Sequence, residues 1–175
     1  SHHDALPISF ADRRDLLVGV MPTAATSGDG VLVQNVNALT LAQRRAYFGT
    51  GELFGRIEKW LAANGGYSPL DVIGMDEDAA GTAATAVITF TGTATAAGTV
   101  TVSVVDEFLF TVTVQVALGA TATVIAAAVD TALDNLVDAP FSSAALVGAV
   151  TVTADEKGTS GNFYGVKVDL QVEGV

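Results

Sequence analysis

The chain has 175 residues, half of them hydrophobic, and it contains no cysteine. This length is enough for one ordinary domain or two small ones, and the lack of cysteine excludes disulfides and thiol catalysis. Acidic residues outnumber basic ones by 19 to 8, which gives a formal net charge of −11. Because an acidic surface repels phosphate and releases no counterions, we expect no binding to nucleic acid or to anionic membranes.

The charge is distributed unevenly along the chain. Residues 1–75 hold seven acidic and six basic residues, whereas residues 76–175 hold twelve acidic residues and two basic ones, Lys157 and Lys167. We interpret the acidic excess as favouring solubility rather than a specific contact. No apolar run is long enough to cross a bilayer, and no secretory signal is recognisable at the N-terminus.

Residues 16–75 have the pattern of an incomplete α/β layer. Residues 16–21 and 70–75 are continuous apolar runs, which are typical of strands buried on both faces. Residues 31–36 alternate well enough for a short additional strand. In this part of the fold, the strands at 16–21 and 70–75 are expected to have unpaired edges.

Two helices are expected between these strands. Thr40 is a suitable N-cap for a helix over residues 41–48, and Gly49 is a suitable stop. A second helix is predicted over residues 51–63, because apolar side chains recur on one face at helical spacing. These side chains are Leu53, Ile57, Trp60 and Leu61.

The character of the chain changes after Met75. Residues 76–81 are acidic and then small, which favours a linker. Beyond it, alternating Thr and Val residues predict strands near 86–90, 100–105, 108–116, 146–154 and 163–172. One helix is predicted over residues 121–137, with a buried stripe of Ile125, Ala128, Val129, Ala132 and Leu136.

These elements predict an α+β fold in two domains. The first is a partial α/β layer at residues 4–75. After the linker at 76–81, residues 82–173 are expected to form a compact five-stranded sheet domain with one packed helix.

Three acidic groups are candidates for metal binding, and each has a simpler interpretation. Residues 76–78 lack the spaced ligands and late Glu of a calcium loop, so a solvated linker is expected there. Asp130, Asp134 and Asp138 stand four apart, where like charges on a helix are mildly destabilising, which predicts a solvated face. Residues 155–158 are interpreted as a polar turn between strands.

Catalytic patterns are missing from the sequence. The two histidines of the chain, His2 and His3, follow Ser1, and this pattern is typical of a purification-tag remnant. With these two histidines set aside, the sequence offers no histidine that could act as a base beside a nucleophile. The glycine-rich stretches lack the Lys-Ser/Thr of a phosphate loop, and residues 158–162 are interpreted as a loop turn rather than an anion nest. We therefore expect a non-enzymatic protein with no catalytic, cofactor-binding or metal-ligating residue and no cofactor.

Two arginine pairs stand out in the basic part of the sequence. These are Arg13 with Arg14, and Arg44 with Arg45. A solvated helix face is the simpler interpretation of Arg44 and Arg45. The alternative hypothesis is an electrostatic contact with a neighbouring acidic subunit.

Several stretches together resemble the tail sheath proteins of contractile-tailed bacteriophages, in the Mu-like branch. Residues 81–99 are similar to the Thr/Ala/Gly-rich strand pair that opens the family's peripheral domain, and residues 121–129 to its single Ala-rich helix. Residues 150–154 and 156–162 are similar to a strand followed by a Lys-Gly-Thr-x-Gly-Asn turn. The order and spacing agree across residues 81–172.

The upstream part is more loosely similar to the same family. Residues 8–10 and 16–19 resemble its opening, and residues 46–53 resemble the segment before a helix and an apolar strand. Sheath subunits are far longer, so the resemblance implies an N-terminal fragment. The remainder would carry the rest of the inner α/β domain and a C-terminal arm.

The resemblance implies a mechanical function. Sheath subunits assemble around a tail tube and drive genome injection when they contract, so the implied partners are other sheath subunits and the tail tube protein. The implied location is the virion tail, assembled in the host cytoplasm, and this fragment alone is expected to be monomeric. The alternative is a surface- or carbohydrate-binding β module, which needs clustered exposed aromatics. Phe108, Phe110, Phe163 and Tyr164 are instead expected in the core.

Overall fold

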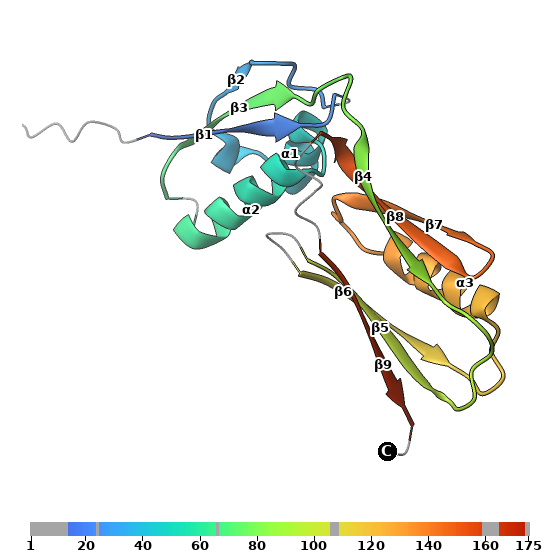
Figure 1. The fold of residues 1–175 in the computed structure, drawn as a ribbon. Coiled ribbons are helices and arrows are strands. Elements are labelled where there is room, and N and C mark those ends of the chain that lie inside the picture. The colour runs from blue at the N-terminus through green and yellow to red at the C-terminus, as the bar shows by residue number, and fades with distance from the viewer. Residues whose placement is uncertain (1–13, 24, 66, 106–108, 159–164, 174–175) are drawn as a thin grey trace, which may run out of the picture.

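The computed structural model describes residues 14–23, 25–65, 67–105, 109–158 and 165–173. The fold is α+β, as the sequence predicts (Figure 1). The N-terminal unit comprises β1 (Asp15–Met21), β2 (Leu32–Val33), a 3-10 helix η1 (Val36–Ala38), α1 (Leu41–Phe48), α2 (Glu52–Asn64) and β3 (Leu70–Asp76). The C-terminal unit comprises β4 (Ala83–Thr89), β5 (Gly98–Val105), β6 (Leu109–Val116), α3 (Ala122–Asp134), β7 (Phe141–Leu146), β8 (Ala149–Lys157) and β9 (Gly165–Val172).

The N-terminal unit is one sheet with two helices beside it. The strand order is β1-β3-β2, with β1 parallel to β3 and β2 antiparallel to it. The predicted strand–strand–helix–helix–strand order is therefore confirmed. The prediction of two strands with unpaired edges is half correct, because β3 is the central strand and β1 is an edge strand in the part of the chain that the structure describes.

The predicted start of α1 is confirmed by its capping geometry. The Thr40 hydroxyl accepts a hydrogen bond from the Gln43 backbone N–H at 3.2 Å, and the Gln43 side chain accepts one from the Thr40 N–H at 2.9 Å. This reciprocal capping box satisfies two backbone donors that a helix otherwise leaves unpaired. Gly49 ends α1 with a positive φ of 71°.

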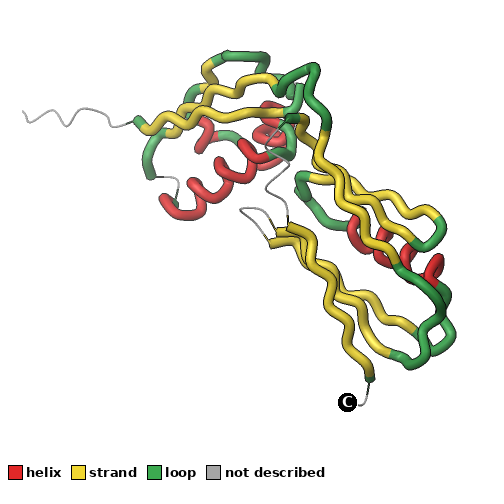
Figure 2. The backbone as a smooth tube through the Cα atoms, viewed as in Figure 1, coloured by secondary structure: helices red, strands yellow, loops and turns green. Residues whose placement is uncertain are grey.

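Both helices lie on one face of the N-terminal sheet, as Figure 2 shows. Phe48, Leu53 and Ile57 are fully buried there against strand residues such as Met21 and Val72. The prediction that residues 16–21 are buried on both faces is wrong. The run of apolar residues suits two covered faces, but both available helices pack on the same one.

The C-terminal unit contains two three-stranded sheets rather than one five-stranded sheet. The strand orders are β4-β8-β7 and β6-β5-β9, and every pairing is antiparallel. β8 and β5 each have a partner on both sides, so neither sheet needs a strand of the other. The helix α3 packs against both sheets, and the core includes Val102, Val129 and Val150 from the three layers.

The C-terminal unit has one strand more than predicted, because the sequence pattern does not indicate the hairpin formed by β7 and β8. The predicted strand at 146–154 covers the last residue of β7, a two-residue turn at Val147-Gly148 and the first part of β8, and the rest of β7 was not predicted. Both turn residues have positive φ, 43° for Val147 and 81° for Gly148. Such turns usually contain Asn-Gly, and a β-branched residue with positive φ is an outlier. The Val147-Gly148 pair therefore does not have the sequence pattern from which a turn is predicted.

The helix α3 is shorter than predicted at its C-terminal end. It stops at Asp134 rather than at residue 137, and the Asn135 side chain donates to the Thr131 carbonyl at 2.8 Å. Its buried stripe is centred on Ala126, Val129 and Leu133, which are at most 2% exposed. The predicted stripe is therefore correct at Val129 and displaced by about one residue elsewhere.

The substitution Val147→Asn is expected to stabilise the protein. Asn adopts the left-handed conformation more readily than Val, so the free energy of unfolding should rise by about 1 kcal/mol. Urea unfolding followed by circular dichroism measures the change. Val137→Asn is the matched control, because Val137 is 72% exposed and its φ is not positive. A variant at residue 147 that is no more stable than the wild type would show that the turn is not strained.

Candidate functional site

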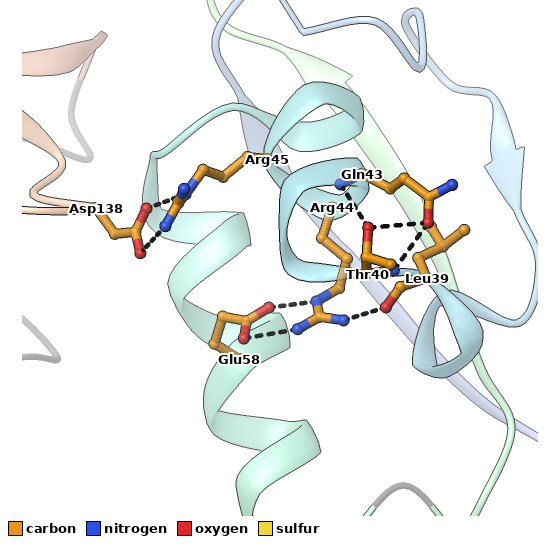
Figure 3. A network of polar contacts seen from close by, with 7 residues as sticks. All are labelled: Leu39, Thr40, Gln43, Arg44, Arg45, Glu58 and Asp138. Carbon is orange, nitrogen blue, oxygen red and sulfur yellow. Dashed lines mark hydrogen bonds and ion pairs between the residues drawn. The ribbon is translucent and has the colours of Figure 1, made fainter.

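The two units are joined by polar contacts between the helices of the N-terminal unit and the C-terminal unit. The Arg45 side chain on α1 forms a bidentate ion pair with Asp138, and its Nη2 donates to Asp138 Oδ2 at 2.5 Å (Figure 3). Asp138 raises the pKa of the Arg45 guanidinium by accepting these hydrogen bonds. Asp138 is therefore not on the solvated face of α3. It lies beyond the helix with a positive φ of 63°.

Arg44 is engaged within the N-terminal unit. Its Nη2 donates to Glu58 on α2 at 3.0 Å, and its Nη1 donates to the Leu39 carbonyl (Figure 3). The simple solvated face predicted for Arg44 and Arg45 is therefore wrong. Both guanidiniums are paired inside the chain, so the hypothesis of a contact with a neighbouring subunit loses the charges on which it depends.

Glu156 links the units through the first turn of α2. It is only 1% exposed, and its Oε1 accepts a hydrogen bond from the Glu52 backbone N–H at 2.9 Å. The N-cap residue Gly51 has no side chain, so a carboxylate from β8 occupies the capping position. A negative charge is favourable there because the helix N-terminus carries partial positive charge.

The contact between Glu156 and α2 depends on the absence of a side chain at Gly51. A Cβ atom at Gly51 would lie 1.8 Å from Glu156 Oε1. The prediction that residues 155–158 form a polar turn is wrong, since residues 155–157 belong to β8. A sequence signal existed: Val150, Val152 and Ala154 alternate inward, and the same period places Glu156 on the buried face.

Glu77 corrects the prediction of a solvated linker at residues 76–78. It is 9% exposed, and its carboxylate accepts hydrogen bonds from the Lys157 N–H at 2.6 Å and from the Thr23 hydroxyl at 3.2 Å. Burial alone raises the pKa of Glu77, but the hydrogen bonds from Lys157 and Thr23 outweigh it, so the pKa lies below its ordinary value. The segment between the units is therefore anchored to both of them.

Asp155 is a further contact at the same junction. Its Oδ2 accepts a hydrogen bond from the Thr50 hydroxyl at 3.4 Å. Burial raises the pKa of Asp155, and the hydrogen bond from Thr50 only partly offsets this. The effect of Asp155 on the pH dependence of stability is therefore opposite in sign to that of Glu77. Folding favours the protonated form of Asp155 and the ionised form of Glu77.

A cleft of about 310 Å³ lies at the junction. Apolar side chains from both units line it, including Leu41, Phe54, Phe110 and Pro140. Phe110 is therefore beside the junction as well as packed against the core, where its ring meets Phe141 edge-on. The acidic groups at the rim, such as Asp138, are paired with arginines, so the cleft offers apolar contact rather than a set of convergent reactive groups.

The remaining acidic candidates have structural partners. Asp130 and Asp134 on α3 both accept a hydrogen bond from the Ser143 hydroxyl, at 2.6 and 3.0 Å. Asp71 forms an ion pair with Arg14 at 2.6 Å, and hydrogen bonds from Arg14 and the Asn35 N–H lower its pKa. The described residues contain no group of three or more His, Cys, Asp or Glu that could hold a metal ion.

Some sequence predictions fall outside the described residues. These are Ser1, His2 and His3, residues 8–10, Arg13, Phe108, Phe163 and Tyr164, and all but the first residue of the 158–162 turn. No helix among the described residues is long and apolar enough to cross a membrane. Among the aromatic side chains in the described part of the chain, Tyr67 is the one that is largely exposed, at 94%.

The uncovered face of the N-terminal sheet is the largest departure from an ordinary α/β layer. Five apolar side chains on this face are between 39% and 60% exposed, namely Leu16, Val18, Val20, Leu32 and Met75, and Asp71, which is paired with Arg14, lies in register with Leu16. Parallel strand pairs usually have both faces covered. The outer edge of β1 also has no strand partner among the described residues. We call this surface the open sheet face.

Comparison with known proteins gives no family for this chain. No protein-family model matches the sequence, and no curated protein matches it significantly.

The substitution Gly51→Ala is expected to destabilise the protein through Glu156. The added methyl group displaces a buried carboxylate from its hydrogen bond, which costs about 1–3 kcal/mol. Urea unfolding measures the loss. The control is Gly165→Ala, because the nearest atom to a Cβ there is 3.9 Å away, and its effect should stay within about 0.5 kcal/mol. Equal effects of the two substitutions would argue against the capping role of Glu156.

The substitution Glu77→Gln is expected to reduce stability at neutral pH and to have less effect in acid. Because folding lowers the pKa of Glu77, its carboxylate stabilises the fold above the ordinary Glu pKa, and this is lost as the pH falls through the folded pKa. Hydrogen bonds to a charged group contribute about 1.5–3 kcal/mol, which sets the expected loss at neutral pH.

Unfolding free energies of wild type and Glu77→Gln, measured from neutral to acidic pH, test this coupling. The difference between the two proteins should shrink as the pH falls. Glu173→Gln, which removes an exposed carboxylate, is the control. A difference that does not change with pH would mean that the charge of Glu77 is unimportant.

Proposed function

We propose that this chain is the N-terminal part of a contractile phage tail sheath subunit of the Mu-like branch. Its function is structural: it assembles around the tail tube and transmits the movement that drives the tube into the host. The resemblance of residues 81–172 supplies the family, and the open sheet face is the observation that carries the argument for assembly.

The open sheet face supports a role in assembly because exposed apolar patches mark interaction sites in many proteins. It combines five exposed apolar side chains with the unpaired edge of β1. Such an edge presents free backbone N–H and C=O groups in register for another strand. The remainder of a longer sheath subunit, or a neighbouring subunit, would cover both features at once.

The junction supports the transmission of movement. Arg45 pairs with Asp138, Glu156 caps α2, and Glu77 accepts hydrogen bonds from both units. These contacts resist bending between the N-terminal and C-terminal units. A contracting assembly changes its intersubunit interfaces between discrete arrangements, and a stiff subunit converts that change into rotation of the whole body.

The proposal implies defined partners and a location. The partners are other sheath subunits and the tail tube protein, and the location is the virion tail after assembly in the host cytoplasm. No binding to nucleic acid or to a membrane is part of the function, and the chain alone is a monomer in dilute solution.

The substitution Val18→Asp tests the open sheet face. In the product of the complete coding frame, electron microscopy should show tubular polymers for the wild type and at least about a tenfold reduction for the variant, because a charge on an interface centre costs more than 1 kcal/mol. The side chain of Val18 is 51% exposed, so stability should change by less than about 0.5 kcal/mol.

Val87→Asp is the matched control, because Val87 is 61% exposed on β4, away from the open sheet face. Tubes that form equally well in wild type, Val18→Asp and Val87→Asp would show that the open sheet face is not an assembly surface. A complete product that forms no tubes in any preparation would contradict the sheath function itself.

A further inference from the structure

The two units have separate apolar cores. The buried apolar side chains of the N-terminal unit, such as Phe48 and Ile57, form one cluster, and those of the C-terminal unit, such as Val102 and Val129, form another. Among the described residues, the two clusters have no member in common. Because burial of apolar surface is the main favourable term in folding, each unit has a source of stability that does not require contact with the other.

The surface between the units is not filled by apolar packing. The cleft of about 310 Å³ lies there, lined by Phe54 of α2 and Phe110 of β6. The chain connects the two units between β3 and β4, through a segment that includes Gly81. Domains move relative to one another unless the interface between them is large and hydrophobic. The relative position of these units therefore depends mainly on the polar contacts of the junction.

Carboxylates of the C-terminal unit accept hydrogen bonds from the N-terminal unit. Glu156 of β8 accepts one from the Glu52 N–H at 2.9 Å, and Asp138 accepts from the guanidinium of Arg45 (Figure 3). An ionised carboxylate is a stronger acceptor than a neutral group, and the charge of Glu156 also faces the partial positive charge at the N-terminus of α2. Both contacts are therefore strongest when the carboxylates are ionised, whereas the two apolar cores contain no carboxylate.

Glu77 ties the connection between the units to both of them. Its carboxylate accepts hydrogen bonds from the Thr23 hydroxyl at 3.2 Å and from the Lys157 N–H at 2.6 Å, and its own N–H donates to the Met21 carbonyl at 3.0 Å. Burial raises the pKa of Glu77, but the hydrogen bonds from Lys157 and Thr23 bring it below its ordinary value. The docked arrangement therefore favours the ionised carboxylate, and this contribution is lost as the pH falls through the lowered pKa.

We propose that the junction is an acid-labile hinge, at which the two units separate in acid while each of them stays folded. At neutral pH the junction carboxylates are ionised and the units are docked. When the pH falls below the range in which a Glu side chain ordinarily titrates, about 4.3, protonation removes the charge that favours docking. The connection between β3 and β4 then remains as the link between two folded units.

Other charged groups at the junction modify this response. They come from α1, α2 and β8, namely Arg45, Glu52, Arg56, Glu58, Asp155 and Lys157. Glu52 is paired with Arg56 within α2, and Arg45 stays cationic in acid, so these groups do not drive the separation. Burial raises the pKa of Asp155, and the hydrogen bond from Thr50 partly offsets this. Protonation of Asp155 therefore favours docking and opposes the release that protonation of Glu77 produces.

Acid also acts inside the N-terminal unit, through Asp71. Hydrogen bonds from Arg14 and the Asn35 N–H lower the pKa of Asp71, so this unit loses some stability as the pH falls. Both partners of this carboxylate belong to the same unit as Asp71 itself. Asp71 therefore provides a matched comparison for Glu77, because it is a carboxylate with a lowered pKa that does not join the two units.

Distances between spin labels in the two units, measured by pulsed electron paramagnetic resonance on the full chain, test the proposal. The chain has no cysteine, so Ala63→Cys on α2 and Ala127→Cys on α3, both at exposed positions, place one label in each unit. At neutral pH the distances should form one narrow distribution. Below about pH 4 the distribution should broaden, while near-UV circular dichroism and the spread of the amide NMR signals remain those of a folded protein.

Variants without charge at the junction distinguish the hinge from general unfolding in acid. The double variant Glu77→Gln/Glu156→Gln should show the broad distribution already at neutral pH, because it lacks both charges and keeps similar side-chain size. Glu77→Gln alone should move the onset of broadening to higher pH. Asp71→Asn should lower stability and keep the narrow distribution at neutral pH. Glu173→Gln, which removes an exposed carboxylate, should behave like the wild type.

Three results would overturn the proposal. The first is a wild-type distribution that stays narrow down to the pH at which circular dichroism shows unfolding. The second is a wild-type distribution that is already broad at neutral pH. The third is an onset of broadening that is the same in the wild type and in Glu77→Gln. The hinge concerns the isolated chain and does not rest on the proposed sheath function, so none of these results bears on whether a longer product forms tubes.

Discussion

The carboxylate of Glu156 at the first turn of α2 is the contact on which the arrangement of the two units depends. It comes from β8 of the C-terminal unit and accepts a backbone hydrogen bond from the N-terminal unit at 2.9 Å, while remaining 1% exposed. A buried carboxylate is costly unless it is paired or hydrogen-bonded. The helix N-terminus provides this compensation only while the units stay in contact, so separation of the units is opposed by the loss of this hydrogen bond and of its interaction with the helix N-terminus.

The same junction explains why a small acidic protein can keep an apolar sheet face exposed. Phe48, Leu53 and Ile57 bury the helical side of the N-terminal sheet, and the junction contacts add support from the C-terminal unit. The unit thus has a core without covering Leu16, Val18 and Val20. An apolar surface that is not needed for the core is available for assembly, which is the physical basis of the proposed function.

Local sequence signals predicted the parts of the fold that local contacts determine. The Thr40 N-cap, the helical spacing of Leu53 and Ile57, and the alternation of β5 are all readable, because each depends on residues a few positions apart. The pairing of Glu156 with α2 crosses more than a hundred residues, so no local pattern contains it. Only the alternation of β8 gave a hint, by placing Glu156 in phase with Val150 and Val152.

The β7–β8 turn was not predicted for a different reason. Turn prediction relies on residues that adopt positive φ at low cost, and Val147 does not. Where a sequence contradicts its local backbone preference, the compensation must come from elsewhere. Neighbouring hydrogen bonds such as that between Phe90 and Gly148 hold the turn in place, but they act on the backbone and would hold Asn equally well. Contacts within the chain therefore explain the turn without explaining its side chain.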